Sequence, residues 1–503
     1  MNKKHLSFFP LCLGLIFCLC TAPTVSAAER PNIIFILADD LGIGDLGSYG
    51  GQKIRTPHLD ALAEEGMRFT RHYSGSNVCA PARAVLMTGI HPGRVVIRNN
   101  REVQPEGQYP MPEGTITLVG ELKRLGYVTG GFGKWGLGPP DSVSAPMRVG
   151  FDRWFGYNCQ RVAHSFYPRY LWDNDRQVLI NENPIPGHAQ LPEGADPNDP
   201  RSYDRFKGEN YSADLISNEA MRFVEENADK PFFLFLPTTV PHLALHVPDE
   251  YLEQYGYLGL WDDPPYPGGR GYTPHFTPRA AYATMVTHMD YEIGRLVRLL
   301  KEKGIYENTL IIVSSDNGAT MDTGGADTTF FNSTGGFRAT KGHMYEGGIR
   351  VPCIVSFPGR IQPGTVTDQL SGFEDWFITL LEIAGVAPED QHPTDGISLV
   401  PILFGKEGDH PVRTWLYRES PGYGGQQTAM IGDWKAIRTG LQPARAAGRS
   451  LADVPVELYN LKDDPFETTD LAAQYPEKVR ELLELMTRER VRSDIFPMPL
   501  IDN

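Results

Sequence analysis

Three short apolar segments each lead into acidic, amide or histidine side chains: 32–37 before Asp39 and Asp40, 232–236 before His242, and 309–313 before Asp316 and Asn317. Apolar runs of this length without alternation are typical of strands buried on both faces of a parallel sheet. The carboxyl ends of parallel strands lie at one edge of a sheet, so we expect these side chains to converge there. Such a group could bind a divalent cation and transfer protons.

A second segment that could do chemistry surrounds a cysteine. Residues 77–89 read NVCAPARAVLMTG, with Pro81 two positions after Cys79 and Arg83 two positions further on. Proline is favoured in the first turn of a helix, so we expect a helix that runs to about Met87 and has Cys79 at its amino end. Free N–H groups and the helix dipole favour an anion at that end, and Arg83 can reach the same anion.

The elements that must position these residues alternate between strand and helix. Apolar residues at helical spacing across 212–228 precede the second strand, and the same spacing across 281–303 precedes the third. This alternation predicts an α/β fold with a large, mostly parallel (mixed) sheet flanked by helices.

The last part of the chain has a different pattern. From about residue 396 it carries short, aromatic, strand-like pieces around Trp415, Trp434 and Tyr459, and then a helix from Pro476 to about Arg492. We therefore expect a main domain over 28–395 and a smaller C-terminal α+β domain over 396–503 that contains an antiparallel sheet.

The amino terminus has the pattern of an export signal. Lys3 and Lys4 precede an apolar run over 6–19, and small residues follow as far as Ala27. A signal peptide over 1–27 predicts an exported protein, periplasmic or secreted. The alternative, a membrane anchor, is weakened because the run is shorter than the ~20 residues that a membrane span needs.

The charge balance limits the kind of partner. The chain has 47 basic and 62 acidic residues and a net charge of −15, which argues against a nucleic acid held by bulk charge. Loss of residues 1–27 would remove two lysines and no acidic residue, so the −15 would become −17. Any anionic substrate must therefore be bound by local groups, and a long polyanion-binding groove is disfavoured.

The cysteines do not form a disulfide framework. Cys12, Cys18 and Cys20 lie in the predicted signal, which leaves three elsewhere: Cys79, Cys159 and Cys353. Three is an odd number, so at least one thiol stays unpaired in an oxidising compartment.

The cysteine segment CAPARAVLMTG, together with other motifs, resembles the maturation signature of the type I sulfatases of the alkaline phosphatase superfamily. In that family a maturation enzyme oxidises the cysteine to formylglycine, whose hydrated aldehyde is the nucleophile. The resemblance covers most of the chain. The other motifs that carry it are ADD at 38–40, GKWGLG at 133–138, PHLALHVP at 241–248, SDNG at 315–318 and KGHMYEGGIRVP at 341–352.

The resemblance implies a cation site. Its ligands would be Asp39, Asp40, Asp316 and Asn317, together with the modified Cys79. A set of carboxylate and amide oxygens suits a hard cation, so Ca²⁺ is favoured, with Mg²⁺ as the alternative and zinc disfavoured.

The resemblance also implies the roles of the remaining site residues. Arg83, Lys134 and Lys341 would hold the sulfate group and offset charge as the S–O bond breaks. Asp316 would help to deprotonate the nucleophile, and His242 with Lys341 would protonate the departing alcohol. The remaining hydroxyl would then expel sulfate and regenerate the aldehyde.

One position departs from the family pattern. Family members usually have histidine where this chain has Gly136, and that histidine commonly assists the second hydroxyl. Glycine cannot do so, which leaves His164, His343 or the metal site alone as the alternatives. His164 is our candidate for a substrate-binding residue.

Two aromatic-rich stretches could contribute to substrate choice. Residues 151–172 contain eight Phe, Trp or Tyr residues, and residues 251–276 contain seven. The first is predicted to be core or a sugar platform. The second is predicted to be a loop over the site or a packing surface against the smaller domain. Export, acidity and aromatic loops favour a sulfated sugar or another small sulfate ester as substrate.

Two rival functions stay open at this point. A phosphonate or phosphate ester hydrolase of the same superfamily would share the metal and formylglycine layout, and relative rates on aryl sulfate and aryl phosphate would distinguish it. A secreted glycan-binding protein with a decayed site is the other rival, and only Gly136 favours it.

Overall fold

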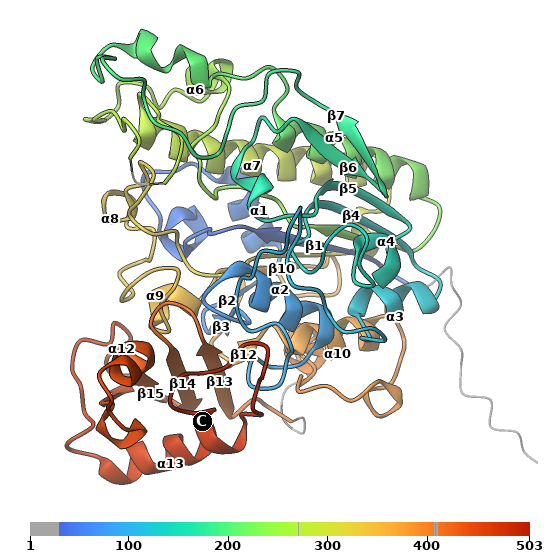
Figure 1. Cartoon of the computed structure of the whole chain (residues 1–503). Helices are drawn as coiled ribbons and strands as arrows, with labels where there is room; N and C mark the ends of the chain where they lie inside the picture. Colours follow the sequence, from blue (N-terminus) through green and yellow to red (C-terminus); the bar gives the residue numbers. More distant parts are fainter. Residues whose placement is uncertain (1–29, 270, 407, 409–410, 503) are drawn as a thin grey trace, which may run out of the picture.

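The computed structural model describes residues 30–269, 271–406, 408 and 411–502. Figure 1 shows a large body of helices around a central sheet and a smaller body at the C-terminal end. The signal peptide predicted over 1–27 lies outside the described residues. Within these ranges no helix has both the length and the apolar character needed to cross a membrane.

A ten-stranded sheet forms the centre of the larger body, in the order β11-β2-β10-β9-β1-β8-β4-β5-β6-β7. β1 pairs in parallel with β8 and β9, whereas β10, β6 and β7 make antiparallel pairs. β3 and β12 form a separate parallel pair. The strands are β1 (Asn32–Ala38), β2 (Met67–Phe69), β3 (His72–Tyr73), β4 (Val128–Lys134), β5 (Arg153–Tyr157), β6 (Tyr170–Asp173), β7 (Arg176–Leu179), β8 (Phe232–Leu236), β9 (Thr309–Ser315), β10 (Cys353–Ser356), β11 (Thr365–Thr367) and β12 (Ser371–Gly372).

Helices cover both faces of this sheet, as Figure 1 shows. Alternate residues of β1 point to opposite faces, so Ile34 and Ile36 pack in one apolar cluster with α1, α5 and α7, and Ile33 and Phe35 pack in another with α2, α3 and α10. The helices are α1 (Pro57–Glu65), α2 (Cys79–Thr88), α3 (Leu118–Arg124), α4 (Pro146–Val149), α5 (Ser212–Asn227), α6 (Asp249–Tyr255), α7 (Pro278–Glu302), α8 (Thr328–Phe331), α9 (Glu346–Ile349), α10 (Asp375–Ile383), α11 (Val400–Leu403), α12 (Leu441–Ala446) and α13 (Pro476–Arg488).

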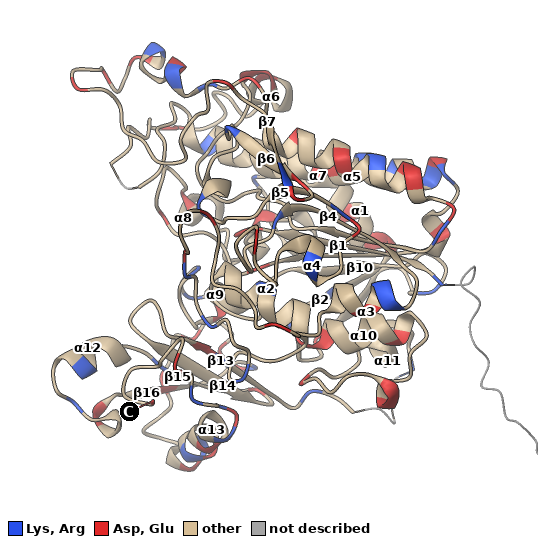
Figure 2. Ribbon diagram, turned by 45° about the vertical axis from the view of Figure 1, so that its right-hand side comes forward, with Lys and Arg blue, Asp and Glu red and all other residues tan. Residues whose placement is uncertain are grey.

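The smaller body is built on a four-stranded antiparallel sheet, β13 (Trp415–Ser420), β14 (Gln426–Ile431), β15 (Trp434–Arg438) and β16 (Val456–Asn460). Its two faces follow the strand alternation. Leu416 and Ile437 pack toward the larger body, and Tyr417 and Ala436 pack against α13. Figure 2 shows Lys and Arg interspersed with Asp and Glu along α13, which faces solvent on its other side.

The predicted fold class is confirmed, including the mixed sheet and the separate antiparallel sheet. The three predicted central strands are β1, β8 and β9, and the helices predicted before the second and third of them are α5 and α7. The helix predicted to begin at Cys79 is α2. The C-terminal helix α13 ends at Arg488, slightly before its predicted end. Within 151–172 most aromatic rings are buried, so this stretch is mainly core.

Candidate active site

The site lies where the carboxyl ends of several strands meet the amino end of a helix. Asp39 and Asp40 directly follow β1, Asp316 directly follows β9, Lys134 is the last residue of β4, and Cys79 is the first residue of α2. All five side chains are buried. The strand ends therefore bring together residues that are as much as 277 positions apart in the chain.

Cys79 lies at the centre of this group. Its Sγ is 3.4 Å from Asp39 Oδ1 and 3.6 Å from Nζ of both Lys134 and Lys341. Burial, and then the charge of Asp316, raises the pKa of the Cys79 thiol to about 12. The thiol is therefore protonated at neutral pH and is a weak nucleophile in this unmodified form.

Each lysine is paired with one carboxylate of the Asp pair. Lys134 Nζ donates to Asp39 Oδ2 at 2.5 Å, and Lys341 Nζ lies 2.7 Å from Asp40 Oδ1. Burial alone would raise the pKa of Asp39, but the charge of Lys134 is the main influence that lowers it. Burial would lower the pKa of Lys341, but the charge of Asp40 raises it well above its ordinary value. Both lysines are therefore held in the charged form.

Arg83 anchors the third carboxylate. Its Nε and Nη2 donate to Asp316 Oδ2 at 3.0 and 2.9 Å, and its Nη1 donates to the Lys134 carbonyl. Burial, followed by the charge of Asp39, raises the pKa of Asp316 to about 6 despite this pairing. Arg83 thus joins α2, β4 and the end of β9 across the site.

The arrangement of Asp40 and Asn317 fits a cation site. Asp40 adopts a left-handed backbone with a φ of 69°, a conformation that costs energy in a residue other than glycine. Asn317 Nδ2 donates to Asp40 Oδ1 at 2.8 Å, whereas the buried Asn317 Oδ1 has no hydrogen-bond partner in the part of the chain that the structure describes. Ligand atoms of Asp39, Asp40, Cys79 and His242 lie within 4.8 Å of one another. An orphaned amide oxygen beside carboxylates suits a hard cation.

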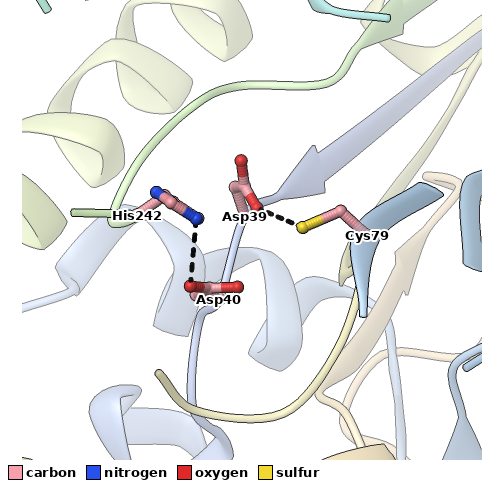
Figure 3. Close-up of side chains that lie close together, drawn as sticks. All are labelled: Asp39, Asp40, Cys79 and His242. Atoms are coloured by element: carbon pink, nitrogen blue, oxygen red, sulfur yellow. Dashed lines mark hydrogen bonds and ion pairs between the residues drawn. The ribbon is translucent and has the colours of Figure 1, made fainter. Parts of the chain in front are cut away.

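His242 approaches the same group from the loop after β8. Figure 3 shows its ring directed at Asp40, with Nε2 3.7 Å from Asp40 Oδ2. Its Nδ1–H donates to the Leu243 carbonyl at 2.6 Å, which fixes the ring. Burial, and then the charge of Lys341, holds the pKa of His242 well below its ordinary value. Nε2 of the neutral ring can thus accept a proton on the side that faces Asp40.

The two histidines named as substitutes for the missing family histidine lie in different surroundings. The His164 ring stacks on His242 with centroids 4.7 Å apart, and its Nδ1 lies 2.7 Å from Nε2 of His188. His343 is exposed, and its Nδ1 bonds to the Thr340 carbonyl within its own loop. The structure therefore brings His164 to the site and leaves His343 outside it.

The space beside Gly136 is filled by another residue. Gly136 has a φ of +79°, and a Cβ there would lie 2.6 Å from Nε2 of Gln160. Gln160 is buried and its Nε2 has no hydrogen-bond partner among the described residues. A larger side chain at position 136 would therefore displace this amide.

Sequence reasoning missed two residues that border the site. Asn100 Oδ1 accepts a hydrogen bond from the backbone N–H of Ala80, the residue after the nucleophile candidate. Tyr423, in the turn between β13 and β14, packs its ring on Gly342 next to Lys341. Neither residue belongs to a periodic pattern, and only the tertiary fold brings them to Cys79.

Both the family models and the individual relatives that match this chain are sulfatases. The family model for sulfatases matches residues 31–386, and the model for the C-terminal region of N-sulphoglucosamine sulphohydrolase matches residues 337–492. An N-acetylgalactosamine-6-O-sulfatase of Bacteroides thetaiotaomicron is 29% identical, over 92% of this chain and 94% of that protein. Human arylsulfatase A is 32% identical, over 93% of this chain and 89% of that protein.

A solved structure has the same fold over most of its length. The crystal structure of Ps i-CgsB in complex with k-i-k-neocarrahexaose has a TM-score of 0.72 and 26% sequence identity. The match covers 92% of each chain.

Proposed function

The chain belongs to the sulfatase family and is a sulfuric ester hydrolase, and from this premise we propose that it cleaves sulfate esters through an aldehyde made from Cys79. The products would be inorganic sulfate and an alcohol. The observation that carries the proposal is the position of Cys79 at the amino end of α2, between two charged lysines and beside three carboxylates.

The protonated thiol supports a chemical change at Cys79 before catalysis. A buried cysteine with a raised pKa is poorly suited to attack sulfur itself. Oxidation to formylglycine would supply a hydrated aldehyde, one hydroxyl of which is the nucleophile. The partner needed for this step is a formylglycine-generating or equivalent maturation enzyme.

The charged side chains divide into two tasks. Lys134, Lys341 and Arg83 would bind sulfate oxygens and offset the charge that develops as the ester bond breaks. Asp316, already held by Arg83, would accept the proton of the nucleophile. His242 and Lys341 lie on the Asp40 side of Cys79, where they would together protonate the departing alcohol. The charged Lys341 carries a proton to give, and the neutral His242 would first take one up at Nε2.

The residues that would hold a cation are Asp39, Asp40, Asp316 and Asn317, with the modified side chain at 79. Their oxygen donors and the partnerless Asn317 Oδ1 favour Ca²⁺, with Mg²⁺ as the alternative. Bound there, the cation would orient the nucleophile and stabilise negative charge on the sulfate oxygens.

We further propose that the substrate is a sulfated carbohydrate. The Bacteroides relative is named for a sulfated amino sugar, and the solved structure at 26% identity is a complex with k-i-k-neocarrahexaose. Export through the signal at 1–27, a catalytic domain over 28–395 and a C-terminal domain over 396–503 belong to the same proposal. A periplasmic or secreted enzyme would meet such glycan fragments outside the cytoplasm.

The test is the mass of the tryptic peptide 72–83, HYSGSNVCAPAR, from protein made in a host with a formylglycine-generating system. We expect an aldehyde in place of the thiol, together with sulfate release from an aryl sulfate. Unmodified cysteine, from a host shown to mature another sulfatase, would contradict the mechanism. Faster turnover of an aryl phosphate than of the aryl sulfate would contradict the choice of ester.

A further inference from the structure

An exposed aromatic ring stands beside the catalytic lysine. Tyr423 lies in the turn Pro421–Gly425 between β13 and β14, and it is 48% exposed. A Cβ added to Gly342 would lie 2.8 Å from two atoms of the Tyr423 ring, so the ring rests directly on the residue that follows Lys341. The C-terminal sheet therefore supplies a side chain to the surroundings of the active site.

The backbone of this turn is held in an unfavourable conformation. Tyr423 has a φ of 50°, in the left-handed region, which is unusual for a bulky residue. Strain of this kind persists only where the surrounding structure enforces it. Gly342, with a φ of +86°, leaves the space that the ring occupies.

A buried amide enforces the position of the turn. Gln426 Nε2 donates to the carbonyl of Gly342 at 2.7 Å and to the carbonyl of Tyr423 at 3.1 Å. Its Oε1 accepts from the backbone N–H of Met344 at 3.1 Å. One side chain of β14 thus ties the turn that carries Tyr423 to the loop that carries Lys341.

The turn also meets the other loop that contacts the cysteine segment. A Cβ on Gly422 would lie 2.7 Å from Asn99 Nδ2, and the next residue, Asn100, accepts from the N–H of Ala80. The Tyr423 turn therefore sits between the loop of Lys341 and the loop of Asn100, both of which touch the surroundings of Cys79.

A second tyrosine, Tyr272, lies near the histidines of the site. The Tyr272 ring stacks on His188 at 4.9 Å and lies 6.2 Å from the His242 ring. Burial raises the pKa of Tyr272 to about 12, and the charges of Lys341, Asp40 and Cys79 act on both phenols. Tyr272 is packed among histidines, whereas Tyr423 leaves nearly half of its side chain open.

We propose that Tyr423 is a specificity-determining residue, whose ring is the platform for the sugar that carries the sulfate ester. This inference rests on the proposed function. A pyranose ring presents a face of C–H bonds, which packs well on a flat aromatic ring, while its hydroxyls stay in water. No hydrogen-bond partner of the Tyr423 hydroxyl is present among the described residues, so the ring rather than the hydroxyl is the feature that the fold presents.

The variants are chosen to separate the ring from the turn. Tyr423→Gly removes the ring and relieves the left-handed strain, so the turn keeps its shape. Tyr423→Phe keeps the ring without the hydroxyl. Tyr291→Ala, which removes a partly exposed tyrosine on α7, is the matched control.

The assay uses the matured enzyme and a panel of sulfated monosaccharides that begins with N-acetylgalactosamine 6-sulfate. We expect Tyr423→Gly to raise KM for the sugar sulfate by about 10-fold with a smaller change in kcat. Tyr423→Phe and Tyr291→Ala should stay within about 2-fold of the wild type. Inhibition by inorganic sulfate, which occupies only the sulfate pocket, should be unchanged in all three.

Three results would overturn the inference. The first is an unchanged KM in Tyr423→Gly while the wild type hydrolyses the sugar sulfate, which would leave the proposed function intact. The second is an equal loss of sulfate inhibition, which would mean that Tyr423 acts by positioning Lys341. The third is a wild type that hydrolyses aryl sulfate but no sugar sulfate, which would also remove the carbohydrate from the proposed function.

Discussion

Two of the buried clusters of opposite charges in this molecule differ in how completely their groups are paired. The active-site cluster consists of Asp39, Asp40, Asp316, Arg83, Lys134 and Lys341. The interface cluster joins the larger body to the C-terminal segment and consists of Glu374, Asp375, Arg413 and Arg418. Every one of these ten side chains is buried.

The interface cluster is closed on itself. Arg418 donates to both oxygens of Glu374 at 3.0 and 2.8 Å, and Arg413 donates to both oxygens of Asp375. The backbone N–H groups of Gly372 and Ile397 complete the Asp375 carboxylate. Each oxygen of these two carboxylates therefore already accepts at least one hydrogen bond.

The active-site cluster contains the same types of residues but is left incomplete. Asn317 Oδ1 has no hydrogen-bond partner within the described ranges, Asp40 holds a strained backbone, and a protonated thiol lies between the two lysines. Buried charge therefore stabilises the fold where every group is paired. It becomes available for chemistry where the fold leaves ligand atoms unpaired.

The largest effect expected from this difference follows the loss of Cys79, the proposed source of the nucleophile. Cys79→Ala should lower kcat/KM for an aryl sulfate by at least about 10⁴-fold, because no other group can take its place. Its melting temperature should stay close to that of the wild type, because the lysines that contact the thiol are already paired with Asp39 and Asp40. Residual activity within about 100-fold of the wild type would show that the cluster works without this residue.

A substitution in the interface cluster should lower stability and leave activity unchanged. Glu374→Gln leaves Arg418 with a buried, unbalanced charge, so the free energy of unfolding should fall by about 3 kcal/mol. Activity per folded molecule should be unchanged. Glu481→Gln, which breaks the exposed pair with Lys478, is the matched control and should change stability by less than about 1 kcal/mol.

The pH dependence of this effect has a definite sign. Burial would raise the pKa of Glu374, but Arg418 and then Arg413 lower it from 4.5 to about 2 in the folded state. The unfolded chain then binds the proton first as pH falls, so the contribution of Glu374 is complete above pH 4.5 and is lost between 4.5 and about 2. Denaturation of wild type and Glu374→Gln across this range should show the gap closing. A gap that is constant across this range would mean that the fold does not lower the pKa of Glu374.

The sequence could predict some strands of the central sheet but not others. The central strands β1, β8 and β9 were predictable because strands buried on both faces are continuous apolar runs. β4 was missed because its sequence, VTGGFGK, contains three glycines that interrupt the apolar pattern. The strand-like piece around Trp434 proved to be the end of β14, a turn at Gly432 and Asp433, and all of β15.

The residues of the candidate site also differ in whether the sequence could predict them. Asp39, Asp40 and Asp316 directly follow strands, so strand position alone predicts their convergence. Tyr423 and Asn100 reach the site through loops from distant parts of the chain, and no local pattern marks them. Local sequence predicts the site residues at the ends of the strands, while the residues that surround them, such as Tyr423 and Asn100, are placed by tertiary packing.

The smallest effect on activity is expected for His164, another residue that surrounds the site. His164 stacks on His242 but is bonded to His188, and its pKa is held well below its ordinary value mainly by burial. It is therefore neutral and in contact with the group that would protonate the alcohol. We expect His164→Ala to lower kcat by about 10-fold, because His242 loses one side of its packing.

The control for this prediction is His343→Ala, which removes the other histidine considered as a substitute for the family residue. His343 is exposed and bonded within its own loop, so its loss should leave kcat unchanged. If His164→Ala leaves turnover untouched, His164 does not compensate for Gly136. Catalysis by the active-site cluster would then need only the residues that contact Cys79 and Asp40. The residues around the cluster would matter only for substrate choice. A loss in His164→Ala with an unchanged pH profile would instead mark His164 as a positioning residue, since a neutral ring that orients His242 adds no titration of its own.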